Sequence, residues 1–173
     1  GANLQVINML DNFKENVKNW ENEGEVADYM RSIIRKESND LSGLIYGMGH
    51  AVYTISDPRA VILKKKAFEL AKGREIEAEF RLLETIERLT PEVFKEVKGS
   101  DKTMCANVDM YSGLVYRMLG IPDDLFTPLF AVARISGWAA HRMEEIITSN
   151  RIIRPAYKAI ARNKEYVKLA DRK

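Results

Sequence analysis

Cysteine, proline and glycine are all scarce in this chain. Cys105 is the single cysteine among 173 residues. No internal disulfide can form, which excludes a disulfide-stapled extracellular scaffold and favours a reducing, cytoplasmic location. The 10 glycines and 5 prolines are few for this length, and apolar residues recur at spacings of three and four rather than two. The sequence therefore predicts an all-α fold.

Long hydrophobic runs and an excess of one charge are also missing. The most apolar window, residues 125–140, is interrupted by Arg134 and is shorter than the roughly 20 residues that a membrane span needs. The 27 basic and 25 acidic residues leave a net charge of +2, which gives no long-range field for a nucleic acid or an anionic membrane. We expect neither a nucleic-acid nor a membrane partner.

What is present is enough apolar sequence, in helical spacing, to build a core. The predicted helices cover residues 4–20, 26–34, 58–72, 75–89, 90–97, 107–119 and 127–147. Asp57 with Pro58, and Thr90 with Pro91, have the form of a helix cap and a first helical residue. Residues 38–58 show no sustained period, and long ordered connections of this kind are usually functional.

His50 lies in this connection, just after Gly47 and Gly49. Glycines let the backbone adopt positive φ and approach a ligand closely, with amide groups and an imidazole as donors. The alternative is an exposed loop histidine beside turn glycines. No cysteine and histidine spacing typical of a metal site occurs in the sequence.

Arg59 and Asp109 each stand in the first turn of a predicted helix. A cation there opposes the helix dipole, so Arg59 either meets an anionic ligand or pairs with Asp57 or water. A carboxylate there is favoured by the dipole, so Asp109 is either a helix-start acid or a functional group.

Arg134 is surrounded by apolar and small side chains for more than two helical turns. We expect it to be buried, and a buried cation needs the carboxylate of either the protein or a ligand. Arg154 precedes Pro155 in an extended tail, where the alternative to binding is a solvated charge.

Four segments together resemble the citrate synthase family. The segment GMGHAVYTISDPR (47–59) is similar to the family signature of a glycine-flanked histidine followed by Asp, Pro and Arg, and NVDMYSG (107–113) resembles the segment of the catalytic aspartate. The segments LFTPLFAVARISGWAAH (125–141) and RIIRP (151–155) resemble the family's carboxy-terminal arginine segments. The four segments stand in the same order as in the family. Together they cover essentially the whole chain.

The resemblance implies a multi-helical citrate synthase small domain over residues 1–120 and the carboxy-terminal segment of the large domain over residues 121–173. Gly1, Ala2 and Asn3 resemble the end of the His-Gly-Gly-Ala-Asn run that holds the family's first catalytic histidine. That histidine would precede Gly1. The parent enzyme would be a homodimer.

The resemblance also implies an acyltransferase of the tricarboxylic acid cycle, which condenses acetyl-CoA with oxaloacetate to citrate and CoA. Asp109 would remove a proton from the thioester methyl group, and His50 would bind the keto oxygen of oxaloacetate. Arg59, Arg134 and Arg154 would bind the two carboxylates, Arg154 reaching the neighbouring subunit's site.

The CoA co-substrate has its own implied contacts, and no permanently bound cofactor is expected. Lys102 would serve the CoA phosphates, because Thr54 stands where many members have a basic residue. The remaining implied CoA contacts are Gly47, Met48, Gly49, Ala51 and Asn107. Two other functions stay open: a 2-methylcitrate synthase that uses propionyl-CoA, and a non-catalytic helical binding module.

We predict that the isolated chain of 173 residues does not turn over. Loss of one catalytic hydrogen-bond donor typically lowers the rate by about 10²–10³. A citrate assay on the purified chain checks this prediction, and near-normal turnover would contradict it.

Overall fold

The computed structural model describes residues 1–100, 103–148, 165 and 167–172. Helices account for most of these residues, and the described part contains no β-strand beyond one isolated bridge. The predicted all-α fold is confirmed. The helices are α1 (Ala2–Asn16), α2 (Glu23–Ile34), α3 (Pro58–Ala71), α4 (Glu77–Lys98), α5 (Asp109–Met118), η1 (Asp123–Leu125), α6 (Phe126–Thr148) and η2 (Leu169–Asp171).

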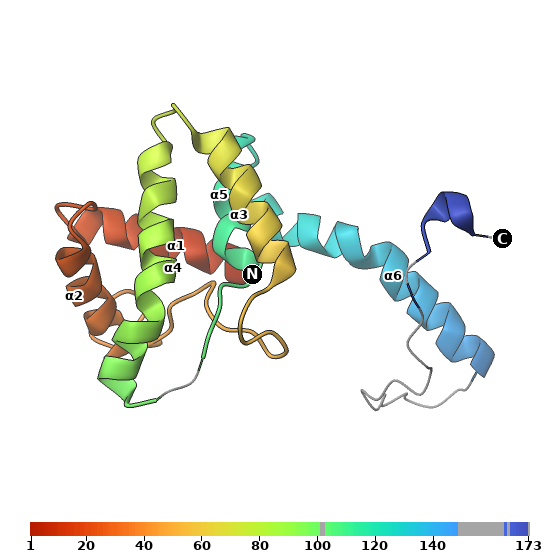
Figure 1. Ribbon diagram of the computed structural model, residues 1–173, viewed down its shortest axis with the longest axis horizontal. Coiled ribbons are helices and arrows are strands. Elements are labelled where there is room, and N and C mark those ends of the chain that lie inside the picture. Colours follow the sequence, from red (N-terminus) through yellow and green to blue (C-terminus); the bar gives the residue numbers. More distant parts are fainter. Residues whose placement is uncertain (101–102, 149–164, 166, 173) are drawn as a thin grey trace. The chain divides into compact units, whose positions relative to one another are not determined.

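The chain divides into two compact units, Gly1–Ala133 and Arg134–Lys173. In the first unit, α4 packs against α2 and α3, and α5 packs against α1 and α3 (Figure 1). The side chains between these helices form one buried core that includes Phe13, Ile33, Phe80 and Tyr111. The division into domains after residue 120 stays a prediction.

Capping residues determine where two of the helices begin. The Asn22 side chain accepts hydrogen bonds from the backbone N–H groups of Gly24 and Glu25 at the start of α2. The Asp57 side chain accepts from the backbone N–H of Arg59 at the start of α3, where Pro58 is the first helical residue. Both contacts satisfy amides that have no partner inside the helix, and the cap predicted at Asp57 is confirmed.

One helix runs through the point where two were predicted. Residues 75–89 and 90–97 were expected to form separate helices, but α4 is continuous from Glu77 to Lys98 with Pro91 inside it. The buried Thr90 hydroxyl donates to the Ile86 carbonyl at 2.6 Å. That bond and the burial of Val93 hold the helix together, although Pro91 provides no backbone N–H for it.

Arg134 is exposed, so the prediction that it is buried was wrong. Its apolar neighbours on α6 are exposed as well, among them Ile135 at 56% and Trp138 at 54%. Phe126 is the single residue of α6 that is fully packed in the described part of the chain. The apolar surroundings of Arg134 in the sequence therefore describe a face of α6 that the described residues leave uncovered.

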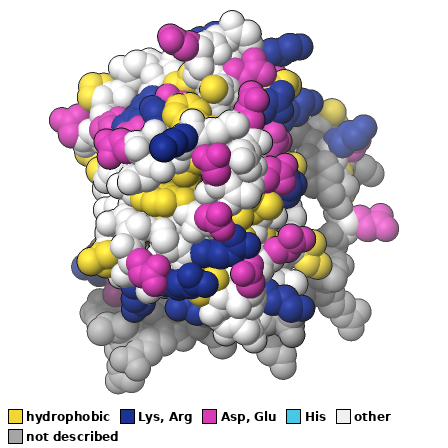
Figure 2. Space-filling view, turned by 90° about the vertical axis from the view of Figure 1, so that its left-hand side faces the viewer, with side chains coloured by type: hydrophobic (Ala, Val, Ile, Leu, Met, Phe, Trp, Pro, Cys, Tyr) yellow, Lys and Arg dark blue, Asp and Glu magenta, His cyan; other side chains and the backbone are white. Residues whose placement is uncertain are grey.

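The surface of the molecule carries charges of both signs. On the face shown in Figure 2, acidic and basic side chains are intermixed, in keeping with the net charge of +2. None of the described helices is both long and apolar enough to cross a membrane.

A close contact between α5 and α1 passes through Gly113 of α5. A Cβ atom at Gly113 would lie 2.5 Å from Cγ1 of Ile7 and 2.9 Å from the Asn3 carbonyl oxygen of α1. We predict that Gly113→Ala destabilises the protein by about 1–3 kcal/mol, although alanine favours a helix by about 1 kcal/mol over glycine. Urea unfolding measures this change.

Gly137→Ala is the matched control for this prediction. Gly137 is also helical, but a Cβ atom there would meet nothing within 4 Å. We expect this variant to be as stable as the parent chain or slightly more stable. Equal effects at the two positions would show that the contact between α1 and α5 does not matter.

Candidate active site

The loop that contains His50 is attached to the segment that leads into α5. Gly49 donates its N–H to the Cys105 carbonyl, and Asn107 donates its N–H to the Gly47 carbonyl, both at 2.8 Å. These bonds flank an isolated antiparallel bridge between Met48 and Ala106. The loop and the start of α5 therefore form one hydrogen-bonded ladder.

Gly47 makes the close approach of the two segments possible. Its φ is +84°, and a Cβ atom there would lie 2.7 Å from Sδ and 2.8 Å from Cα of Met110. Gly49 also has a positive φ, of +90°. The prediction that these glycines adopt positive φ is confirmed, and the contact with Met110 excludes a side chain at position 47.

His50 is half-buried, and its ring is held by the backbone that follows it. The Nδ1 atom accepts hydrogen bonds from the N–H groups of Val52 and Tyr53, at 3.0 and 3.1 Å. The Tyr53 ring lies beside the imidazole, with 4.8 Å between the centroids. A neutral imidazole that accepts at Nδ1 carries its proton on Nε2, so His50 has a donor to offer on its other side.

The Nε2 atom of His50 lies 3.1 Å from Nη2 of Arg59. A guanidinium only donates, so with the proton of His50 on Nε2 the two nitrogens do not hydrogen-bond to each other, but both can donate to one shared oxygen acceptor. A carbonyl or carboxylate oxygen fits this requirement. The pair therefore forms a small binding point for an oxygen acceptor.

Asp57 orients the guanidinium of Arg59. The Asp57 side chain is fully buried and accepts from Nε of Arg59 at 3.0 Å and from Nη2 at 2.8 Å. The hydrogen bond from Arg59 holds the pKa of Asp57 below its usual value, against the opposing effect of burial. Of the alternatives for Arg59, pairing with Asp57 is the one observed. That pairing leaves about half of the Arg59 side chain exposed.

Asp109 is the first residue of α5 and is half-buried. Its backbone N–H donates to Oδ1 of Asn107 at 2.9 Å. The pKa of Arg59 lies above its usual value, mainly because of its hydrogen bond to Asp57, and the charge of Asp109 contributes to the same shift. Asn107 also donates from its side chain to the Gly49 carbonyl, so Asp109 and the residue before His50 are joined through one side chain.

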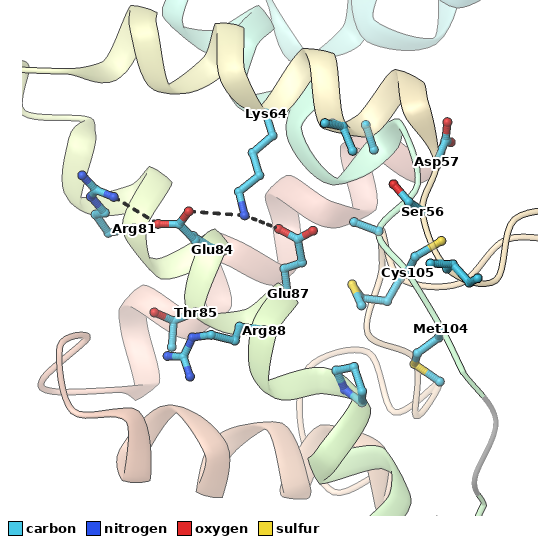
Figure 3. A pocket seen from close by; sticks show the side chains of 16 residues that line it. Ser56, Asp57, Lys64, Arg81, Glu84, Thr85, Glu87, Arg88, Met104 and Cys105 are labelled. Atoms are coloured by element: carbon cyan, nitrogen blue, oxygen red, sulfur yellow. Dashed lines mark hydrogen bonds and ion pairs between the residues drawn. The ribbon is translucent and has the colours of Figure 1, made fainter.

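A cavity of about 650 Å³ lies behind this region, between α3, α4 and residues 104–106 (Figure 3). Met48 and Asp57 contribute to its wall, whereas His50, Arg59 and Asp109 do not. Lys64 points into it between Glu84 at 3.3 Å and Glu87 at 2.8 Å. The charged side chains in the cavity wall are thus largely paired with one another.

The remaining predicted site residues fall into three groups. Met48 is half-buried and Ala51 is exposed, both in the His50 loop. Arg134 is exposed on α6, in the second compact unit. Lys102 and Arg154 lie outside the described residues. In the described residues, the structure thus brings together the part of the predicted site that comes from residues 47–59 and 107–109.

Comparison with known proteins identifies the family. The model of the family "Citrate synthase, C-terminal domain" matches residues 1–156. This chain belongs to the citrate synthase family. It is 39% identical to the citrate synthase of Synechocystis sp. over 173 residues, which cover 99% of this chain and 39% of that protein. It is also 34% identical to the 2-methylcitrate synthase of Shewanella oneidensis over 157 residues, 90% of this chain and 36% of that protein.

Solved citrate synthase structures share the fold. The citrate synthase of Thermoplasma acidophilum, in a ternary complex with carboxymethyl coenzyme A and oxaloacetate, has a TM-score of 0.66 at 29% identity and covers 99% of this chain. The citrate synthase of Thermotoga maritima has a TM-score of 0.65 at 30% identity and covers 100% of this chain. The chain spans 42% of either structure.

The sequence did not reveal two of the contacts that hold the site. The Asn107 side chain donates from Nδ2 to the Gly49 carbonyl at 2.9 Å, next to His50, and the Tyr111 hydroxyl of α5 donates to Glu87 of α4. An asparagine two residues before a helix start is a sign of a local turn, but no sequence signal identifies its distant partner.

We predict that Asp57→Asn leaves the cap of α3 intact and removes the charge behind Arg59. Asparagine caps a helix about as well as aspartate. Because the pKa of Asp57 lies below its ordinary value of 3.8, the ionised carboxylate stabilises the fold above that pH. This contribution is lost as the pH falls through the lower pKa of the folded state. Since Arg59 is half exposed, we expect a loss of about 1 kcal/mol at pH 7.

Urea unfolding between pH 2.5 and 7 measures this difference. The stabilities of the parent and Asp57→Asn should converge toward the acid end of the range. Asp28→Asn is the control, because the Asp28 side chain is 79% exposed in an ion pair with Arg31. A gap between the parent and Asp57→Asn that stays constant with pH would contradict the assigned role of the charge.

Proposed function

We propose that this chain supplies part of the active site of a citrate synthase, which condenses acetyl-CoA with oxaloacetate to give citrate and CoA. The observation that carries the proposal is the pair of donors on His50 and Arg59, whose Nε2 and Nη2 atoms lie 3.1 Å apart. A keto acid offers a carbonyl and a carboxylate oxygen that suit such a pair. Asp109 is joined to the loop of His50 through the two side-chain hydrogen bonds of Asn107.

These residues can perform the chemistry in a defined order. The Asp109 carboxylate takes a proton from the thioester methyl group, and the resulting enolate carbon bonds to the keto carbon of oxaloacetate. His50 gives the Nε2 proton to the keto oxygen as that oxygen becomes a hydroxyl. Water then cleaves the thioester and releases citrate and CoA.

Two further arginines would bind the second carboxylate of oxaloacetate. Arg134 and Arg154 are proposed for it, because a planar guanidinium can donate two parallel hydrogen bonds to a carboxylate. Arg134 is exposed on α6, as a residue that meets a ligand must be. The proposed CoA contacts are Gly47, Met48, Gly49, Ala51, Lys102 and Asn107. The homodimer and the cytoplasmic location stay predictions.

Propionyl-CoA is a second candidate for the acyl substrate, because a 2-methylcitrate synthase is among the relatives of this chain. The 2-methylcitrate synthase of Shewanella oneidensis is 34% identical to this chain, close to the 39% identity of the Synechocystis citrate synthase. The two reactions differ by one methylene group on the acyl chain, which a pocket distinguishes by only about 1–3 kcal/mol. The residues assigned here do not separate the two reactions.

The test uses a complete enzyme that contains these residues, because the chain spans only 39% of the Synechocystis relative. We expect turnover with oxaloacetate and acetyl-CoA, at a higher kcat/KM than with propionyl-CoA. Asp109→Asn should lower kcat by about 10²–10⁴-fold, since it removes the base. Arg59→Gln should raise the KM for oxaloacetate by about tenfold or more, since it removes a charged hydrogen-bond donor.

Arg31→Gln is the matched control for the arginine. Arg31 also binds acidic side chains, Asp28 and Glu96, but lies on α2, which contributes no residue to the site. This variant should keep the kcat and KM of the parent. Binding of oxaloacetate without turnover in the complete enzyme would favour a non-catalytic module, and a preference for propionyl-CoA would favour 2-methylcitrate synthase.

A further inference from the structure

Asn107 connects the two proposed catalytic groups through both ends of its side-chain amide. Its Oδ1 atom accepts the backbone N–H of Asp109 at 2.9 Å. Its Nδ2 atom donates to the carbonyl of Gly49, the residue before His50, at 2.9 Å. One side chain thus contacts the backbone beside the proposed base and the backbone beside the proposed keto-oxygen donor.

The backbone of Asn107 takes part in the same connection. Its N–H donates to the Gly47 carbonyl at 2.8 Å, and its carbonyl accepts the N–H of Met110 at 3.1 Å. The side-chain amide and both backbone polar groups of this residue are therefore engaged in joining the His50 loop to the first turn of α5.

The start of α5 depends on this side chain because its neighbour cannot replace it. Val108 occupies the N-cap position and makes no side-chain cap hydrogen bond. The first N–H groups of a helix have no partner within the helix, and Asn107 satisfies that of Asp109 from one residue further back. The orientation of the Asp109 backbone thus depends on Asn107.

The loop on the other side contains two glycines, whose backbone must be ordered for His50 to be held in place. Gly47 and Gly49 have φ values of +84° and +90°, and glycine has more conformational freedom to lose on ordering than any other residue. A Cβ atom at Gly49 would meet nothing within 4 Å, so side-chain packing does not fix the backbone there. The bond from Nδ2 of Asn107 restrains the peptide that leads directly into His50.

We infer that Asn107 is a positioning residue, which sets the distance between the Asp109 carboxylate and the His50 imidazole through its two side-chain hydrogen bonds. This inference rests on the proposed function. It gives Asn107 a role distinct from a direct contact with CoA. A displacement of about 1 Å in a reacting group can lower the rate about a hundredfold. Loss of the Asn107 side chain should therefore change the kinetic constants as well as the stability.

Two substitutions in a complete enzyme separate the two bonds. Asn107→Ala removes both and should lower kcat by about 10–100-fold, with a several-fold higher KM for oxaloacetate. Asn107→Ser keeps an oxygen that can accept the Asp109 N–H in a local turn, but it is too short to donate to Gly49. We expect Asn107→Ser to recover kcat at least threefold relative to Asn107→Ala, while its KM for oxaloacetate stays raised.

Asn22→Ala is the matched control. Asn22 is also an asparagine whose side-chain oxygen accepts backbone N–H groups at a helix start, here those of Gly24 and Glu25 of α2. Its loss should lower Tm by a few degrees and leave kcat and KM unchanged. The comparison separates the loss of a cap from the loss of positioning.

The inference is overturned if Asn107→Ala folds and has the kcat and KM of Asn22→Ala while Asp109→Asn is inactive. If Asn107→Ala does not fold, Asn107→Ser decides, and parental values of both constants in that variant overturn the inference. Serine and alanine variants with identical kinetics would overturn the division of roles between the two bonds. A parent enzyme that makes no citrate or 2-methylcitrate counts against the proposed function instead.

Discussion

The contact between the Gly47 backbone and Met110 is the constraint on which the candidate site depends. With a φ of +84° and no room for a Cβ atom, residue 47 lets an irregular loop lie directly on the first turn of α5. Once the loop lies there, backbone bonds to Cys105 and Asn107 can form. His50 and Asp109 then come from distant parts of the sequence to the same region, without a sheet to align them.

The recognition of an anion that we propose for this molecule would be local, because the charge of the whole molecule is too small to attract one. The net charge of +2 is small, and the charges on the surface are mixed in sign on the face shown in Figure 2. The candidate site instead combines a guanidinium, fixed from behind by the buried Asp57, with an imidazole fixed by two backbone N–H groups. Fixed donors of this kind need no reorganisation when a ligand arrives.

Local signals in the sequence predicted the helices and the parts of the site that lie near one another in the chain. Asp57 could be identified as a cap because its partner is two residues away. The bond from Asn107 to Gly49 spans 58 residues, and Pro91 lies inside α4 because of tertiary packing. Such contacts have no local signature. The burial of Arg134 was wrongly predicted for a related reason. Apolar neighbours in the sequence indicate burial only where another element of the fold covers them.

The tight packing at Gly113 has a mechanical consequence for the site. Since a Cβ atom at Gly113 would clash with Ile7 and the Asn3 carbonyl of α1, α5 and α1 pack with no space between them at this point. Asp109 begins the same helix, so its carboxylate stands on an element whose position is limited by this packing. A larger side chain at position 7 would press on Gly113, and so on the helix that carries the proposed base.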